Sequence, residues 1–127
     1  MKIQNKQFGE IEYNEDSIFK FKDGIIGFEE LSNFILITEK ESYFSWLTSV
    51  EQPEIIFPLF PIELLNEDAK KENDLEPFGI VKLDKNPANI TINLKAPVYI
   101  NYDAKIGFQK ISESEELPLD FPLFVNN

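Results

Sequence analysis

The sequence contains no cysteine, no histidine and no arginine among its 127 residues. Without cysteine the chain cannot form disulfides, thiolate nucleophiles or cysteine-containing zinc and iron–sulfur sites. Without histidine it lacks the side chain that titrates near neutral pH and the commonest metal ligand, which excludes Ser-His-Asp and Cys-His catalysis. We therefore expect no enzyme activity, no metal site and no cofactor.

Basic side chains are also scarce. Twelve lysines stand against 23 acidic residues, which gives a formal net charge of -11. Such a chain is repelled by phosphate backbones and by anionic membrane surfaces. The lack of arginine also removes the bidentate guanidinium contacts that read guanine or hold phosphate. We expect other proteins as partners, with no direct binding to nucleic acid or membrane.

Long apolar runs are missing as well. No stretch reaches the roughly 18 apolar residues of a transmembrane helix, and residues 1–7 lack the apolar core of a signal peptide. We therefore expect a cytoplasmic protein, which we also expect to be a monomer. The length fits one domain spanning residues 1–127. Residues 113–127 are expected to be loosely ordered.

Short segments with alternating apolar residues are what the sequence does contain, and this pattern is typical of β-strands. In residues 43–50 the alternation places Phe44, Trp46, Thr48 and Val50 on the face expected to point into the core. Short strands at such spacing predict an all-β, mainly antiparallel fold, a small closed or partly open barrel with at most one short helix. The expected strands are residues 8–13, 19–21, 34–38, 43–50, 55–57, 78–83, 89–94, 97–101 and 106–111.

Prolines modify this pattern at two places. Pro58 and Pro61 cannot donate a backbone hydrogen bond, so residues 57–61 are predicted to lie at a sheet edge or to leave the sheet. Pro97 predicts that one strand ends at Leu94 and that the chain turns a corner before the next. Residues 62–71 carry apolar residues at roughly helical spacing and are the candidate for the single short helix.

Three motifs in order resemble those of the flagellar assembly factor FliW family. They are Phe8-Gly9-Glu10-Ile11-Glu12, then Phe21-Lys22-Asp23-Gly24-Ile25-Ile26-Gly27-Phe28-Glu29, and Ile92-Asn93-Leu94-Lys95-Ala96-Pro97-Val98-Tyr99-Ile100-Asn101 followed by Lys105-Ile106-Gly107-Phe108-Gln109. The resemblance covers residues 3–111, but residues 58–84 are shorter and richer in proline than the family's usual acidic segment. The signature residues are expected to be structural, and they are Phe21, Gly24, Gly27, Phe28, Asn93, Leu94, Ala96, Pro97 and Asn101.

The resemblance implies a barrel-like β-fold without catalysis and two mutually exclusive partners. These are flagellin and the translational repressor CsrA, a basic RNA-binding protein. It implies that accumulated flagellin occupies the chain and leaves CsrA free to repress flagellin translation. When flagellin is exported, the chain captures CsrA and translation resumes.

Two sets of residues are candidates for partner contacts. Carboxylates that would attract the basic CsrA electrostatically are Glu29, Glu30, Glu51, Glu54 and Glu63. An apolar groove for an amphipathic flagellin helix is expected at Phe57, Leu59 and Phe60, although simple burial also explains these residues.

A second class of function remains open. The chain fits a small sugar- or peptide-binding β-barrel, or a carboxylate-dependent enzyme, whose ligand lies against Tyr43 and Trp46 in the barrel mouth. An exposed aromatic cleft with convergent carboxylates would favour this alternative. A filled barrel with Trp46 buried would favour the protein-binding function.

Overall fold

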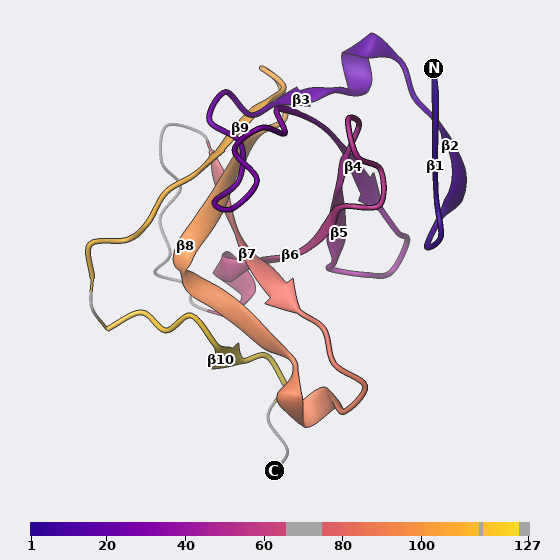
Figure 1. Ribbon diagram of the computed structural model, residues 1–127. Coiled ribbons are helices and arrows are strands. Elements are labelled where there is room, and N and C mark those ends of the chain that lie inside the picture. Colours follow the sequence, from indigo (N-terminus) through magenta and orange to yellow (C-terminus); the bar gives the residue numbers. More distant parts are fainter. Residues whose placement is uncertain (66–74, 115, 125–127) are drawn as a thin grey trace.

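The computed structural model describes residues 1–65, 75–114 and 116–124. Within this part, seven strands close into a barrel in the order β8-β7-β6-β5-β4-β3-β9 and back to β8, with β10 added beside β8 (Figure 1). All pairings are antiparallel except β3 with β9. The predicted fold class is confirmed. The strands are β1 Lys2–Asn5, β2 Gly9–Glu12, β3 Phe19–Lys20, β4 Asn33–Thr38, β5 Ser45–Ser49, β6 Ile56–Pro61, β7 Glu76–Lys82, β8 Thr91–Asn101, β9 Ile106–Gln109 and β10 Phe121–Pro122.

Helical structure in the described residues is limited to three 3₁₀ turns. They are η1 Glu15–Ser17, η2 Ile62–Leu64 and η3 Pro87–Asn89. The helix predicted over residues 62–71 therefore begins as η2, whereas residues 66–71 lie outside the described part. None of these turns is long enough to cross a membrane, and no other helix is present in the ranges described.

Apolar side chains from every strand of the ring except β9 fill the barrel. Phe21, Phe34 and Leu47 have no exposed surface, and the Phe21 and Phe34 rings meet edge to face with centroids 5.1 Å apart. Burying each such side chain contributes about 1.5–3 kcal/mol to folding. Gly107 on β9 is needed for this packing because a Cβ there would collide with the Phe21 ring. The barrel has a packed core, and its interior is no open channel.

The prediction of which face of β5 points into the core is wrong, because the face opposite to Phe44 and Trp46 points inward. Leu47 belongs to the core, and Ser45 and Ser49, which share its face, are buried with it. Trp46 and Phe44 lie on the outer face, where Trp46 meets Phe8 edge to face at 5.8 Å. The small residues suit the narrow interior, and the large aromatic ones are covered from outside. Alternation alone could not show which face is inside because both faces are covered.

That outer cover is a two-stranded hairpin, β1–β2, whose first strand the sequence pattern did not reveal. Figure 1 shows the hairpin outside the ring, beside β4 and β5. Its turn forms because Asn5 Oδ1 accepts a bond from Phe8 N at 2.7 Å and Gly9 has a φ of 69°. Asn5 Nδ2 also donates to Pro53 O at 3.3 Å, tying the hairpin to the β5–β6 turn. The hairpin buries Ile3 and half-buries Trp46.

The prediction that residues 57–61 lie at an edge or leave the sheet is wrong. Strand β6 lies between β5 and β7. Pro58 is in register with Trp46 of β5 only, and Pro61 with Phe78 of β7 only. Each proline thus has one flank without a ladder partner, where a missing N–H is tolerated. The stagger of strands in a closed barrel makes such positions available inside the sheet.

The corner predicted at Pro97 lies inside one continuous strand. Phe78 of β7 faces Val98, whereas Ile80 faces Asn93, so residues 94–97 of β8 lie opposite Gly79 alone. Asn93 Oδ1 accepts bonds from Lys95 N at 2.9 Å and Ala96 N at 3.0 Å and supports this irregular stretch. The chain bends here without leaving the sheet, and Figure 1 shows the change of direction along β8. The prediction of two separate strands is therefore wrong.

The C-terminal segment follows β8 towards its beginning. Ser112 N bonds to Lys95 O at 2.7 Å, Leu94 N to Pro118 O at 3.0 Å, and Leu123 N to Ile90 O at 3.0 Å. Between these points Phe121 is in register with Ile92. Residues 118–123 thus lie on the flank of β8 that β9 leaves open. Their loose order stays a prediction.

Candidate functional site

The second signature motif closes one end of the barrel with two tight turns. Gly24 and Gly27 have φ values of 67° and 90°, which glycine adopts at little cost. A Cβ at Gly24 would lie 2.6 Å from Phe28 O, so the chain could not pass there with a larger residue. Phe28 N donates to Ile25 O at 2.6 Å. The turns bury Ile25 and place Ile26 at the surface.

The third motif meets the second at this end. Gln109 Oε1 accepts a bond from Ile26 N at 2.8 Å, and Gln109 Nε2 donates to Ala96 O at 3.0 Å. One side chain on β9 therefore joins the loop of residues 21–32 to the bend in β8. Segments far apart in the sequence are held together by these two bonds.

A mostly apolar pocket of about 400 Å³ lies where the two motifs meet, and we call it the mouth pocket. Phe57 and Ile80 are half-buried, pack against the barrel core and also line the pocket. Three of its lining side chains are largely exposed: Ile26 at 51%, Ile111 at 59% and Leu119 at 65%. The lining is completed by Ile25, Asn93, Lys95, Ala96 and Gln109.

Glu51, one of the predicted carboxylates, is a structural clamp. It accepts bonds from Ser32 N at 3.0 Å, Ser32 Oγ at 3.2 Å, Asn33 N at 3.0 Å and Asn33 Nδ2 at 3.2 Å. Its partial burial raises the pKa, but the hydrogen bonds from Ser32 and Asn33 outweigh this and lower the pKa below its ordinary value. The clamp fixes the end of the loop of residues 21–32 against the β5–β6 turn.

The other predicted carboxylates are spread over the surface. Glu29 accepts a bond from Gly27 N at 3.1 Å, which lowers its pKa, and Glu30 is exposed beside it. Glu54 lines a second, more polar pocket of about 760 Å³ with the N-terminal hairpin. Glu63 lies in η2, which follows the C-terminal end of β6, whereas Glu54 precedes the N-terminal end of that strand. Glu29 and Glu30 thus lie in the loop of residues 21–32 and Glu51 binds the end of that loop, whereas Glu63 lies in a different turn.

The predicted apolar groove does not form one surface. Leu59 is fully buried in the core, and Phe57 packs edge to face on Phe28 at 5.3 Å. Phe60 lies on the outer face of β6, where it meets Phe44 at 5.5 Å and Tyr43 at 6.3 Å. Of the three, only Phe57 lines the mouth pocket. The sequence analysis did not select Ile26, Ile111 and Leu119, because their exposure depends on the fold. Ile26 and Gln109 lie within the family motifs, but nothing in the sequence marked them as pocket residues.

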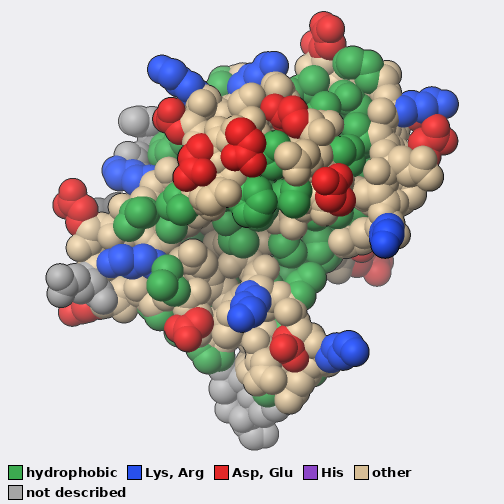
Figure 2. All heavy atoms as spheres, viewed as in Figure 1, with side chains coloured by type: hydrophobic (Ala, Val, Ile, Leu, Met, Phe, Trp, Pro, Cys, Tyr) green, Lys and Arg blue, Asp and Glu red, His purple; other side chains and the backbone are tan. Residues whose placement is uncertain are grey.

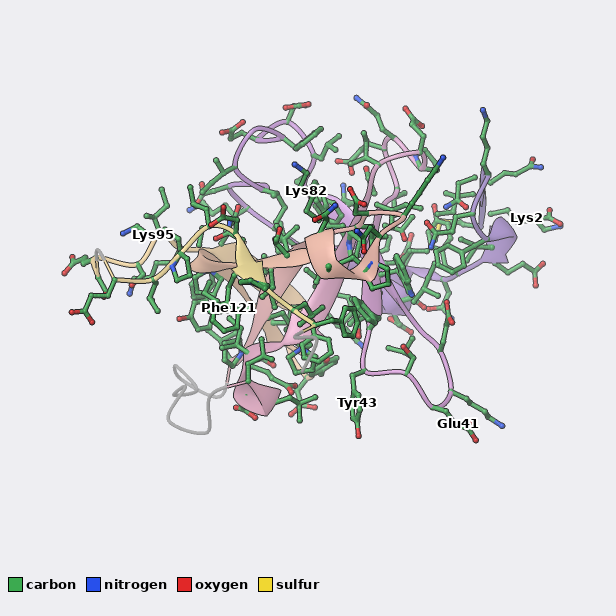
Figure 3. The ribbon with its side chains drawn as sticks, turned by 90° about the horizontal axis from the view of Figure 1, so that it is seen from below. Lys2, Glu41, Tyr43, Lys82, Lys95 and Phe121 are labelled. Atoms are coloured by element: carbon green, nitrogen blue, oxygen red, sulfur yellow. The ribbon has the colours of Figure 1, made fainter. Side chains whose placement is uncertain are left out.

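Tyr43 and Trp46 do not form a platform in the barrel mouth. Trp46 is half-buried on the outside of the barrel, with its indole Nε1 enclosed and unpaired among the residues described. Tyr43 is 68% exposed and points away from the barrel (Figure 3). No group of three acidic side chains close enough to hold a metal ion occurs in the described residues. Tyr43 and Trp46 therefore do not offer the aromatic cleft that the alternative function requires.

Comparisons with known proteins agree with these motifs. The family model described as FliW protein matches residues 2–68 and 61–123. The chain belongs to the FliW family. The flagellar assembly factor FliW of Caldicellulosiruptor saccharolyticus is 33% identical over 138 residues, which cover 98% of this chain and 91% of that protein. The FliW of Clostridium kluyveri is 39% identical over 139 residues, covering 98% and 96% respectively.

A crystal structure of the flagellar assembly factor FliW has the same fold. It matches with a TM-score of 0.87 and 28% sequence identity over 99% of both chains. FliW membership places this chain among flagellar assembly factors. In this FliW-family barrel, the signature residues Asn93 and Ala96 line the mouth pocket, and Gly24 and Gly27 form the turns beside it.

Proposed function

We propose that the chain acts in the cytoplasm as a monomer that binds flagellin and, alternately, CsrA, without catalysing a reaction. The observation that carries this proposal is the mouth pocket. Two signature motifs meet there through Gln109 and leave Ile26 and Ile111 exposed around an apolar hollow. Exposed apolar side chains grouped around a pocket are typical of protein-docking surfaces.

Flagellin is the proposed occupant of the mouth pocket. An amphipathic helix presents apolar side chains on one face, which suit a pocket lined by Ile26, Phe57 and Ile111. This location replaces the groove expected at Phe57, Leu59 and Phe60, because those side chains lie on two faces of β6.

CsrA is proposed to be attracted by charge. The net charge of -11 draws a basic protein and repels RNA, so the chain would act on an RNA regulator without touching its RNA. Figure 2 shows several acidic side chains gathered on one face of the molecule. Glu29 and Glu30 lie in the loop beside the mouth pocket, so both partners would approach the same end of the barrel. Flagellin and CsrA would then exclude each other.

The test is a calorimetric titration of the purified chain with monomeric flagellin and, separately, with CsrA. We expect one-to-one binding in each case, and we expect flagellin to displace CsrA in a competition titration. Simultaneous binding would contradict the partner switch. If neither protein binds, the proposed function is wrong.

A further inference from the structure

The C-terminal segment covers a strand edge that would otherwise be open. We call residues 117–124 the strap. On one flank, β8 pairs with β7 through Thr91, Ile92 and Asn93. On the other flank the same stretch of β8 is paired with the strap, with Phe121 opposite Ile92 and Pro122 opposite Thr91. Figure 3 shows Phe121 on the strap, next to β8. Without the strap, this flank would present free N–H and C=O groups.

The strap is apolar but weakly embedded. Its sequence is Leu-Pro-Leu-Asp-Phe-Pro-Leu-Phe, and none of its residues is buried. Leu119, Phe121 and Phe124 keep 65%, 38% and 45% of their surface exposed. Its attachment to β8 consists largely of backbone bonds, such as those from Leu94 N and Leu123 N, which another extended chain can make equally well. The strap therefore sits where a strand from another molecule could replace it.

The strap also reaches the mouth pocket. Leu119 lines the pocket together with Ile26 and Ile111. The covered edge of β8 and the pocket are thus one continuous surface, and the strap holds part of it. The strap itself indicates what the surface accepts, which is an extended segment with an apolar side chain at the position of Leu119.

We propose that this edge of β8, together with the mouth pocket, is a strand-addition site that the strap occupies in the free chain. Its ligand is an extended apolar segment of a protein partner, uncharged or basic, because a chain of net charge -11 repels an acidic one. The partner segment displaces the strap and adds to β8 as a new strand. This inference rests on the proposed function and changes one part of it, because the partner segment that takes the place of the strap is extended and not helical.

The experiment uses three full-length forms of the chain. The first is wild type. The second carries Thr91→Cys and Pro122→Cys at facing positions, and because the sequence has no cysteine of its own, oxidation links only the strap to β8. The third carries Leu119→Asp and Phe121→Asp, both at exposed positions, to loosen the strap without entering the core. The probe is a fluorescent peptide with the sequence of residues 117–124 in which asparagine replaces Asp120, so that it carries no acidic side chain.

We expect the peptide to bind the loosened variant at least tenfold more tightly than wild type, because the attached strap competes at high effective concentration. The oxidised cysteine pair should bind no peptide, and reduction of the same sample should restore binding to the wild-type level. Equal binding to the oxidised and reduced forms would overturn the inference, as would no binding to the loosened variant. Circular dichroism of all three forms checks that they are folded.

The peptide assay contains neither flagellin nor CsrA, so this inference and the proposed function can fail separately. If the peptide binds the three forms as expected but neither flagellin nor CsrA binds the chain, the strand-addition site stands and the two proposed partners are wrong. If flagellin and CsrA bind but the disulfide does not change peptide binding, the proposed function stands and the strand-addition site is wrong.

Discussion

At the scale of single residues, Glu51 shows how a surface carboxylate can be structural. Its oxygens take four hydrogen bonds from Ser32 and Asn33, two of them from backbone N–H groups. The ionised form is therefore favoured in the folded chain. Of the carboxylates predicted to attract CsrA, Glu29 accepts one backbone hydrogen bond, from Gly27 N, and Glu51 accepts two, from Ser32 N and Asn33 N.

Replacing Glu51 by glutamine should cost about 1 kcal/mol of unfolding free energy at pH 7, because neutral hydrogen bonds replace charge-assisted ones. The pKa of Glu51 is lowered from its ordinary 4.5, so the stabilisation is complete above that value and is lost as the pH falls through the lowered native pKa. Urea unfolding of wild type and Glu51→Gln from pH 7 to pH 3 should show the difference shrinking. Glu54→Gln in the same turn is the control, and an equal loss there would contradict the clamp.

Tyr102 predicts a second pH dependence, at the alkaline end. Burial, with a smaller contribution from Glu76, raises the pKa of Tyr102 from 10.0 to about 12. The protonated form is favoured in the folded chain, so its contribution is present below pH 10 and is lost as the pH rises towards 12. In urea unfolding between pH 9 and 11.5, wild type should lose stability more steeply than Tyr102→Phe. Tyr43→Phe is the control, and matching slopes for wild type and Tyr102→Phe would contradict the prediction.

At the scale of elements, the positions of most strands could be predicted from the sequence, but the segments that pack on each strand could not. The hairpin of β4 and β5 follows from two apolar runs with a short polar connection. The inner face of β5 did not follow, because Trp46 is covered by the N-terminal hairpin, a contact between segments far apart in sequence. The prediction that Pro58 lies at a sheet edge was wrong for a related reason. A strand inside a sheet can hold a proline where one neighbouring strand leaves that residue without a ladder partner, and the sequence does not show where this occurs.

The candidate site could be predicted only in part. The glycine turns at Gly24 and Gly27 were visible from residue type. That Gln109 ties them to Ala96 was not visible, because it depends on two hydrogen bonds that join the loop of residues 21–32 through β9 to β8. The exposure of Ile111 and Leu119 likewise depends on the path of the C-terminal segment over β8.

The N-terminal hairpin should act as the cover of Trp46. Phe8→Ala removes the ring that meets Trp46 at 5.8 Å, and we expect a loss of about 1–2 kcal/mol in unfolding free energy. Tryptophan emission should shift to longer wavelength, because the single indole gains contact with water. Leu83→Ala, at an exposed position, should leave the emission unchanged. Unshifted emission in Phe8→Ala would mean that the hairpin does not shield Trp46.

At the scale of the whole molecule, the closed barrel and the charge have separate roles. The barrel holds the second and third family motifs together at one end, and the charge of -11 acts over longer distances. Because exposed charges are screened beyond about 10 Å at 0.1 M salt, the association rate with CsrA should fall steeply between 50 and 500 mM salt. Stopped-flow fluorescence measures it. A rate indifferent to ionic strength would remove the electrostatic part of the account.

The most direct test of the central claim is the affinity of flagellin for a chain altered only in the mouth pocket. Ile26→Asp places a charge at a pocket residue that is 51% exposed, and Leu83→Asp does the same outside the pocket at 50% exposure. By isothermal titration calorimetry, we expect Ile26→Asp to weaken flagellin binding at least tenfold and Leu83→Asp to bind like wild type. Wild-type affinity in Ile26→Asp would contradict docking at the mouth pocket.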